Sequence, residues 1–365
     1  MSNKQTFRGC MIFLCGILLC AAYFTVAAPK PRLRIVQTNS AGDNINIIDP
    51  ATHAVVGEIK GIEAPHGIAA SRDGSRIYVS EEAQKTLDVV DGKTLEVIKR
   101  IPLSGGVPNL IALTPDERRL YVALRPSWDD LSHFPQVLAR NNGAIDVIDT
   151  GTLQDVKTIP LKGGIHDLYV TPDGKYVVGG AARDIEPPVN MMSVIDTGTN
   201  EVAWTLSMSP SPSPMAIYTN PDGSTKWILA QNGSLNGFVV VDFATRREIK
   251  RVNNPEIPLE KQNPSGPPSP SHGIAVTSDQ KTLLVNSRLN SALYAYSLPD
   301  LKLLGSTALS GVGASWLTIT PDNKTAYVAN EQSNNVSVVD IKSMKEIARI
   351  PVGFVPARNI AWMLP

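Results

Sequence analysis

The chain is a series of short runs in which apolar and polar residues alternate. Residues 317–352 hold four such runs in a row: Leu317–Thr320, Thr325–Ala329, Val336–Asp340 and Glu346–Ile350. A period of two, with β-branched residues in the runs and turn residues between them, predicts four short antiparallel strands. A single sheet of this kind cannot bury both of its faces, so it requires neighbouring copies.

Two turn signatures supply the evidence for such copies. In the first signature, successive aspartates lie 43, 57, 49, 57 and 43 residues apart, at Asp73, Asp116, Asp173, Asp222, Asp279 and Asp322. The second signature occurs seven times, at Asp49, Asp91, Asp149, Asp196, Asp242, a degenerate Ser297 and Asp340. We interpret these aspartates as turn caps, because Asp bonds the backbone two residues on. Four strands in each repeat predict an all-β, seven-bladed β-propeller.

The repeats also carry a family resemblance. Tyr327–Asn330 and Tyr78–Glu81, each followed by a strand that ends in Val-Val-Asp, resemble the YVTN-type repeats of bacterial YncE-like and surface-layer-like proteins. The resemblance covers roughly residues 32–365 and implies a seven-bladed propeller. It implies no single activity, since binding proteins, lyases, lactonases and dehydrogenase subunits share this fold.

The two ends of the repeat region predict how the ring closes. Three strands, Leu33–Gln37, Asn44–Ile48 and Ala54–Ile59, come first without an inner strand before them. A lone inner strand, Ala357–Trp362, comes last. We therefore expect these four strands to form one blade, so that residues 32–365 are a single domain whose closed ring hides sheet edges.

The first 27 residues read as a secretory signal peptide. Lys4 and Arg8 precede an apolar stretch, Met11–Phe24, and small residues follow it, so we expect cleavage after Ala27. Retention as a membrane anchor is the alternative. All three cysteines lie within this segment, so the propeller has no thiol or disulfide. We expect a periplasmic or secreted protein with no membrane span once the signal is removed.

The overall charge excludes some partners. The formal net charge is zero, from 34 basic and 34 acidic residues. We therefore expect no nucleic-acid binding, and we expect a monomer.

The long loops predict where the function lies. All three, Arg125–Asn142, Ala181–Asn190 and Asn253–Ser271, belong to the connections that share one face of a propeller. Loops positioned by a rigid scaffold often carry function, although drift in tolerant loops is the alternative. The Pro-rich Asn253–Ser271 is expected to be extended, and Trp128 to stand on the rim of a ligand site.

Three of the five histidines occupy one position of the repeat. His66, His166 and His272 each lie seven residues before a turn aspartate, where an inner strand begins. Neutral imidazoles there could hold a divalent metal, zinc or copper, with Asp167 orienting a ring or acting as a base. In the alternative, each ring simply hydrogen-bonds the backbone of a neighbouring blade.

Charged and polar residues follow the second strands on the same face. They suit an anionic or polar ligand, and they are Glu81, Glu82, Arg125, Arg183, Asn232, Arg288 and Glu331. The first hypothesis is an exported propeller that binds a small polar ligand or a protein partner at the channel mouth. The second is a metal-dependent lyase or hydrolase, lactonase-like, that uses the same histidines. The third is a non-catalytic interaction platform accessory to a periplasmic dehydrogenase.

Overall fold

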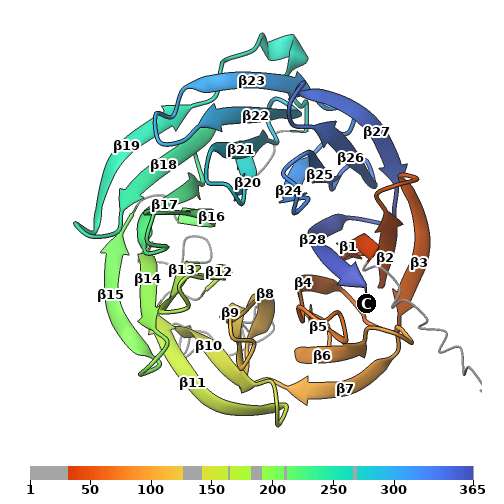
Figure 1. Cartoon of the computed structure of the whole chain (residues 1–365), viewed down its shortest axis with the longest axis vertical. Coiled ribbons are helices and arrows are strands. Elements are labelled where there is room, and N and C mark those ends of the chain that lie inside the picture. The colour runs from red at the N-terminus through yellow and green to blue at the C-terminus, as the bar shows by residue number, and fades with distance from the viewer. Residues whose placement is uncertain are drawn as a thin grey trace, which may run out of the picture. The chain divides into compact units, whose positions relative to one another are not determined.

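Seven four-stranded antiparallel sheets form a ring, as Figure 1 shows in a view down its axis. The computed structural model describes residues 32–125, 142–162, 165–181, 191–208, 212–265 and 269–364. The predicted signal peptide, residues 1–27, lies outside the described residues. The predicted all-β, seven-bladed β-propeller is confirmed.

Each sheet presents one strand to the axis and one to the rim. The inner strands are β4 (Pro65–Ala70), β8 (Val107–Leu113), β12 (Asp167–Val170), β16 (Pro212–Thr219), β20 (Ser271–Val276), β24 (Ala314–Ile319) and β28 (Pro356–Leu364). The second strands are β5 (Arg76–Glu81), β9 (Arg119–Arg125), β13 (Tyr176–Gly180), β17 (Thr225–Asn232), β21 (Thr282–Ser287), β25 (Thr325–Asn330) and β1 (Arg32–Asn39). The third strands are β6 (Thr86–Asp91), β10 (Asn142–Asp149), β14 (Met191–Asp196), β18 (Gly237–Asp242), β22 (Ala292–Ser297), β26 (Asn335–Asp340) and β2 (Asn44–Asp49). The outer strands are β7 (Val97–Pro102), β11 (Gln154–Lys162), β15 (Glu201–Ser207), β19 (Arg247–Asn253), β23 (Leu303–Ala308), β27 (Lys345–Pro351) and β3 (Ala54–Lys60).

The last sheet joins the two ends of the ring, as the sequence predicts. Its strand order is β28-β1-β2-β3, and β28 pairs with β1 in the register Ile35↔Ala361. We call this sheet the split blade, and we number the others blades 1 to 6 in chain order from β4–β7 to β24–β27. Trp362 of β28 is buried against Ile68 and Ile77 of blade 1, so the C-terminal strand also packs the blade interface.

Alternation along the strands buries both faces of each sheet. On β6, Leu87 and Val89 pack toward blade 2, whereas Val90 packs toward the split blade. The outer strands are only half covered, and β27 alternates exposed with partly or fully buried positions. Since each fully buried Val or Ile stabilises the fold by about 1.5–3 kcal/mol, the inner three strands of every blade hold most of the core.

The two ends of the ring differ in their connections. One end, which we call the turn face, carries the aspartate turns. There Asp322 Oδ1 accepts hydrogen bonds from Thr320 Oγ1 at 2.7 Å and from the Lys324 backbone N–H at 3.2 Å. Asn323 between them adopts a φ of 58°, a left-handed conformation that Asn tolerates. The interpretation of these aspartates as turn caps is therefore confirmed at this turn, and Asp73 bonds Ser71 and Ser75 in the same way.

The other end, which we call the mouth face, carries the remaining connections. Six of the inner strands have a register shift against their second strands just where they begin, as between Pro65 and Ile68 of β4 and between Ala314 and Trp316 of β24. Such bulges bend a strand and redirect its side chains. His66, His272 and Arg358 lie within such shifts, on β4, β20 and β28.

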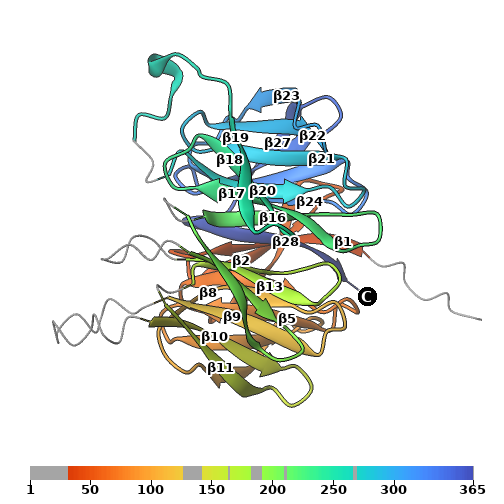
Figure 2. The same ribbon diagram turned by 90° about the vertical axis from the view of Figure 1, so that its left-hand side faces the viewer.

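The Asn253–Ser271 connection lies on the mouth face, and most of it is described. Pro258 and Gln262 are extended, and between them lies a short 3₁₀ turn, η2 (Leu259–Lys261), which the sequence did not predict. A further turn follows at Pro264 and Ser265. Asn263 anchors the connection, because its backbone N–H donates to Leu289 O and its amide donates to Gln332 Oε1 at 2.9 Å. The loop therefore lies over blade 5 and reaches blade 6. In the side view of Figure 2, η2 stands away from the body of the ring.

No helix among the described residues has the length and apolar character that would let it cross a membrane.

Candidate binding site at the channel mouth

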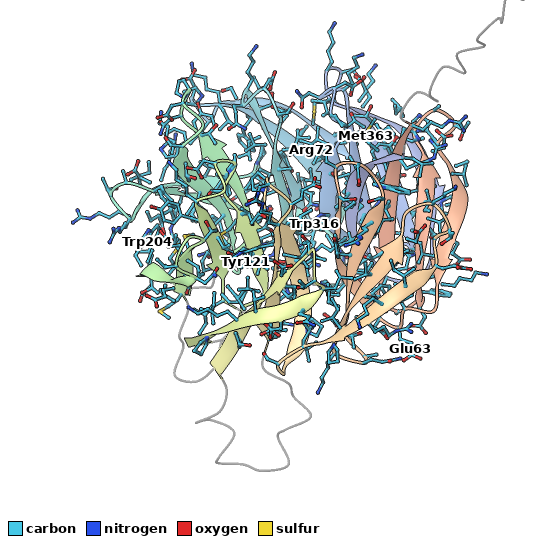
Figure 3. All side chains as sticks on the ribbon, turned by 60° about the horizontal axis from the view of Figure 1, so that its bottom comes forward. Glu63, Arg72, Tyr121, Trp204, Trp316 and Met363 are labelled. Carbon is cyan, nitrogen blue, oxygen red and sulfur yellow. The ribbon has the colours of Figure 1, made fainter. Side chains whose placement is uncertain are left out.

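A buried ion pair crosses the centre of the ring. Arg358, on β28 of the split blade, donates from Nη2 to Asp167 Oδ1 of blade 3 at 3.0 Å. These blades stand on opposite sides of the ring (Figure 1). Both side chains are buried, with exposures of 2% and 0%. The ring of Trp316 lies against the guanidinium, 4.1 Å from its carbon to the ring centroid, and Figure 3 shows Trp316 inside the ring of blades. The pair therefore links the split blade to blade 3 across the channel.

The His166 ring stands beside this ion pair. Its Nδ1 lies 2.9 Å from Asp167 Oδ2 and 3.2 Å from Ser213 Oγ of blade 4, and Ser213 also donates to Asp167. Asp167 therefore bonds three groups from three blades. Because a carboxylate can only accept, His166 Nδ1 carries a hydrogen and Nε2 is the basic nitrogen of the neutral ring.

His272 of blade 5 meets His166 edge to face, with 6.4 Å between the ring centroids. Its Nδ1 donates to the backbone carbonyl of Ser315 in blade 6. For His272, the bond to a neighbouring blade's backbone that we weighed as the alternative is therefore present. The ring is nevertheless part of the cluster, since it also lies within electrostatic reach of Arg358 and Asp167.

His66 of blade 1 belongs to a second group at the mouth. Its Nδ1 lies 3.0 Å from Glu82 Oε1, which also accepts from Arg125 at 2.6 Å and from Asn109 at 3.1 Å. Glu82 and His66 come from blade 1, whereas Arg125 and Asn109 come from blade 2. One carboxylate oxygen thus links two blades and orients the imidazole.

The pair Arg288–Glu331 repeats this arrangement in blades 5 and 6. Arg288 Nη2 lies 2.7 Å from both Glu331 oxygens, and Nη1 lies 3.3 Å from Ser269 Oγ of the Asn253–Ser271 connection. The arginine is nearly buried, with 6% of its side chain exposed. An arginine–glutamate bridge therefore joins neighbouring blades twice around the mouth.

The electrostatics follow from burial and from these pairs. Burial, and next the charge of Arg358, lower the pKa of His66 to about 4. Burial would raise the pKa of Glu82, but His66 and Arg125 outweigh it and lower that pKa to about 2. For Asp167, His166 and Arg358 likewise outweigh burial and hold its pKa well below the usual range. Burial, followed by Arg288 and Arg358, lowers the pKa of His272.

The predicted shared metal does not fit this geometry well. Within the described ranges, no group of three or more His, Cys, Asp and Glu side chains is placed to hold a metal ion. The Arg358 charge close to His66 and His272 also opposes a divalent cation. In all three histidines the hydrogen bonds described above are made by Nδ1. Nε2 is therefore the nitrogen that could bind a metal, while Nδ1 donates to an orienting group. Zinc or copper at His66, His166 and His272 stays a prediction.

The other predicted ligand-binding residues are placed as follows. Glu82, Arg125, Asp167, Arg288 and Glu331 lie on the mouth face in the contacts above. Asn232 is buried at the end of β17, paired with Pro212. Trp128 and Arg183 lie outside the described residues, as do most of the two loops that contain them.

Sequence reasoning missed Arg358, Trp316 and Ser213. Asp167, Trp316 and Arg358 share the repeat position directly after the histidine position. Comparing that next position across the blades shows one acidic, one aromatic and one basic side chain among small or aliphatic residues. These three exceptions at one repeat position could have identified Trp316 and Arg358 as candidate site residues from the sequence.

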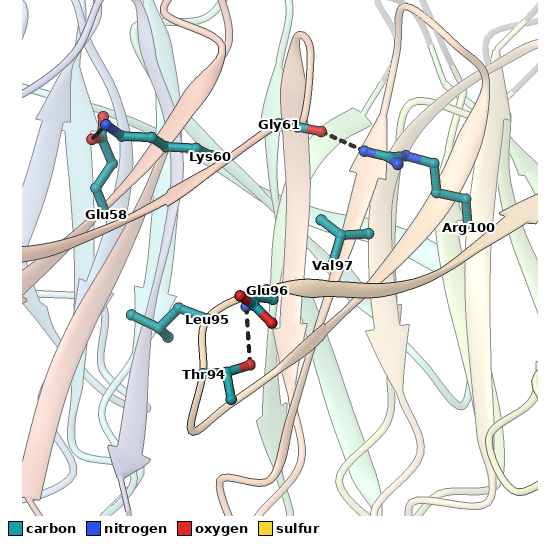
Figure 4. Close-up of a pocket in the computed structure, with 8 residues that line it drawn as sticks. All are labelled: Glu58, Lys60, Gly61, Thr94, Leu95, Glu96, Val97 and Arg100. Atoms are coloured by element: carbon teal, nitrogen blue, oxygen red, sulfur yellow. Dashed lines mark hydrogen bonds and ion pairs between the residues drawn. The ribbon is translucent and has the colours of Figure 1, made fainter.

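A concavity lies away from the channel, on the rim between the split blade and blade 1. It measures about 440 Å³, and its lining is Glu58, Lys60, Gly61, Thr94, Leu95, Glu96, Val97 and Arg100 (Figure 4). Arg100 donates to the Gly61 carbonyl across it and pairs with the buried Asp88 at 3.2 Å. Its charged groups belong to this local packing, and none of them belongs to the contacts described at the mouth.

Comparisons with known proteins agree with this architecture. The family model described as "Lactonase, 7-bladed beta-propeller" matches residues 192–349, which is less than half of the chain. The hydrazine synthase subunit beta of Kuenenia stuttgartiensis is 26% identical over 274 residues, covering 69% of this chain and 58% of that protein. A seven-bladed beta-propeller protein of Mycobacterium tuberculosis is 30% identical over 151 residues, covering 40% of this chain and 33% of that protein. The chain thus spans less than two thirds of the length of either relative.

Solved structures show the same fold. A chain of Kuenenia stuttgartiensis hydrazine synthase superposes with a TM-score of 0.68 at 24% identity, over 84% of this chain and 91% of that one. The periplasmic gluconolactonase of Pseudomonas aeruginosa superposes with a TM-score of 0.69 at 15% identity, over 91% of this chain and 100% of that one. The finer resemblance to YVTN-type repeats stays a prediction. The chain is a seven-bladed β-propeller with sequence similarity to the lactonase-type propeller and to a hydrazine synthase subunit.

Proposed function

We propose that this protein binds a small polar ligand at the mouth of its central channel. The observation that carries the proposal is the convergence of Arg358, Asp167, His166 and His272 from three blades onto the axis. Buried ion pairs add little net stability compared with apolar packing. The buried Arg358–Asp167 pair is therefore not explained by stability alone. Together with the imidazoles beside it, the pair provides the convergent polar groups that are typical of a ligand site.

The histidine ring signals of the protein test this proposal by NMR. Acetate, glycolate and glycerol serve as probes, and single substitutions assign the five histidines. We expect the signals of His66, His166 and His272 to move on titration. His53, in a turn on the opposite face, is the internal reference and should not move. Shifts confined to His53, or no shift with any probe, would contradict binding at the mouth.

A second candidate function is hydrolysis of a cyclic ester at the same mouth. The observation that favours it is the His166–Asp167 pair, because a carboxylate-oriented imidazole is the usual general base. Nε2 of His166 would take a proton from water while the water oxygen attacks the ester carbonyl carbon. The ring C–O bond then breaks, and the proton passes to the leaving oxygen, which gives a hydroxy acid. The partial match to the lactonase model supports this class of substrate.

Hydrolysis of γ-butyrolactone, followed by proton release at constant pH, tests the second candidate. We expect His166→Gln to lower the rate by about 10²–10⁴-fold, the usual contribution of a general base. His53→Asn on the turn face is the control. A wild-type rate no higher than that of buffer, or an undiminished rate in His166→Gln, would exclude this role for His166.

A further inference from the structure

Some buried nitrogens at the mouth, Nε of Arg125 among them, have no hydrogen-bond partner among the described residues. Two of them, Nε2 of His66 and Nε of Arg358, belong to adjoining residues. Neither is at the surface, since the His66 side chain is 16% exposed and that of Arg358 only 2%. A buried polar atom without a partner is destabilising, so two of them on adjoining residues point to a further hydrogen-bonding group.

The two residues are neighbours. Thr38 Oγ1 lies 2.9 Å from the carbonyl oxygen of His66 and 3.1 Å from that of Arg358, and it accepts the Arg358 backbone N–H at 3.0 Å. The charge of Arg358 is also the largest electrostatic influence that lowers the pKa of His66. His66 on β4 and Arg358 on β28 thus adjoin where the split blade meets blade 1.

The chemical roles of the two nitrogens are opposite. Glu82 accepts from Nδ1 of His66, so Nδ1 carries the hydrogen, and at neutral pH Nε2 offers only a lone pair. Nε of Arg358 can only donate, because a guanidinium has no acceptor. Nη2 of Arg358 is already bonded to Asp167, and the Trp316 ring covers one face of the guanidinium. An acceptor and a donor therefore remain on two adjoining residues.

We propose that His66 Nε2 and Arg358 Nε recognise a hydroxyl group of the ligand. A hydroxyl donates one hydrogen bond and accepts others, so it satisfies both atoms at once. A bare carboxylate offers no hydrogen to His66, and an ammonium group cannot accept from Arg358. This inference rests on the proposed ligand site and names its ligand class as small hydroxylated molecules, with hydroxy acids such as glycolate as the simplest members.

Matched pairs of probes test the inference, because glycolate differs from acetate only by one hydroxyl. We expect wild-type protein at pH 7 to bind glycolate at least about tenfold more tightly than acetate, since buried polar groups reject an analogue that leaves them unpaired. Lactate and propionate should show the same ratio. The full chain is titrated, and the shifts of the His66 and His166 ring signals are the readout.

Two variants remove one nitrogen each. His66→Phe removes the acceptor, and Arg358→Lys keeps the positive charge beside Asp167 but lacks Nε. Both should reduce the glycolate-to-acetate ratio to about one, whereas His53→Asn should keep the wild-type ratio. The ring ¹⁵N shifts of His66 give an independent reading that needs no ligand and no variant, and they should show the Nδ1–H tautomer.

The outcomes separate the inference from the proposal beneath it. Equal binding of acetate and glycolate at the mouth, or a hydrogen on Nε2 of His66, would show that His66 and Arg358 do not recognise a hydroxyl group. The proposed ligand site would stand in either case. If a ratio persists in both variants, other residues recognise the hydroxyl and the inference is overturned. If no probe shifts any mouth histidine, both the site and the inference fail.

Discussion

The turn face and the mouth face of the ring use the same residue types in opposite ways. On the turn face, Asp322 bonds Thr320 and Lys324, its near neighbours in the chain. On the mouth face, Asp167 bonds Arg358, which lies 191 positions away. The Asp322 carboxylate finds its hydrogen-bond donors within two residues of the chain and stays exposed. The Asp167 carboxylate is buried, and its Arg358 donor comes from another blade.

This difference explains what each face can do. Local turns repeat in every blade because each needs only its own few residues, so this face supports the fold. The mouth requires a closed ring before its charges meet, so its chemistry belongs to the ring as a whole. Substitutions should therefore act locally and weakly on one face, and globally on the other.

Removing residues 358–365 should have the largest effect. The truncation deletes most of β28, leaves β1 as an open edge, and strips Asp167 of its buried partner. We expect loss of the cooperative thermal transition, followed by circular dichroism. The exposed Met363→Ala is the control and should melt like the wild type. A truncated protein that melts normally would show that ring closure does not depend on this strand.

Glu81→Gln should have an intermediate, pH-dependent effect. Glu81 and Asp88 are both fully buried on the mouth side of blade 1, and burial, followed by Asp88, raises the pKa of Glu81 to about 7. A raised carboxyl pKa contributes stability that is complete below the unfolded value of 4.5 and is lost as pH rises through about 7. From pH 4.5 to pH 8, the wild type should therefore lose about 1–3 kcal/mol relative to the variant.

Urea unfolding of both proteins at the two pH values measures this loss. Parallel stabilities for the wild type and Glu81→Gln at both values would mean that Glu81 is ionised in the folded protein at low pH.

Asp73→Ala on the turn face should have the smallest effect. Bonds from Ser71, followed by Ser75, lower the pKa of Asp73 to about 2. Its contribution is present above the unfolded value of 3.8 and is lost as pH falls through about 2. We expect a loss of about 1 kcal/mol or less at pH 7, seen as a small shift of the urea midpoint. A loss as large as that of a mouth substitution would remove the contrast between the two faces.

The fold was predictable because its signals are local and repeated. The strands, the aspartate turns and the closure by β28 follow from patterns within a few residues, multiplied by the repeats. The histidine position was predictable for the same reason. Asp167 beside His166 was expected from the sequence. The partners from other blades were not, because the pairing of Asp167 with Arg358 depends on which blades oppose each other across the axis. The predicted metal shows this limit, since spacing aligned three imidazoles but could not tell that Arg358 lies near two of them.

The most direct test of the account is the coupling energy between Arg358 and Asp167. Urea unfolding at pH 7 of wild type, Arg358→Gln, Asp167→Asn and the double variant closes the cycle. Each single substitution leaves a buried charge unpaired, so we expect each to cost about 3–5 kcal/mol and the double variant to cost clearly less than their sum. A coupling of at least about 2 kcal/mol supports a site assembled across the channel, and losses that add to within about 0.5 kcal/mol would contradict it.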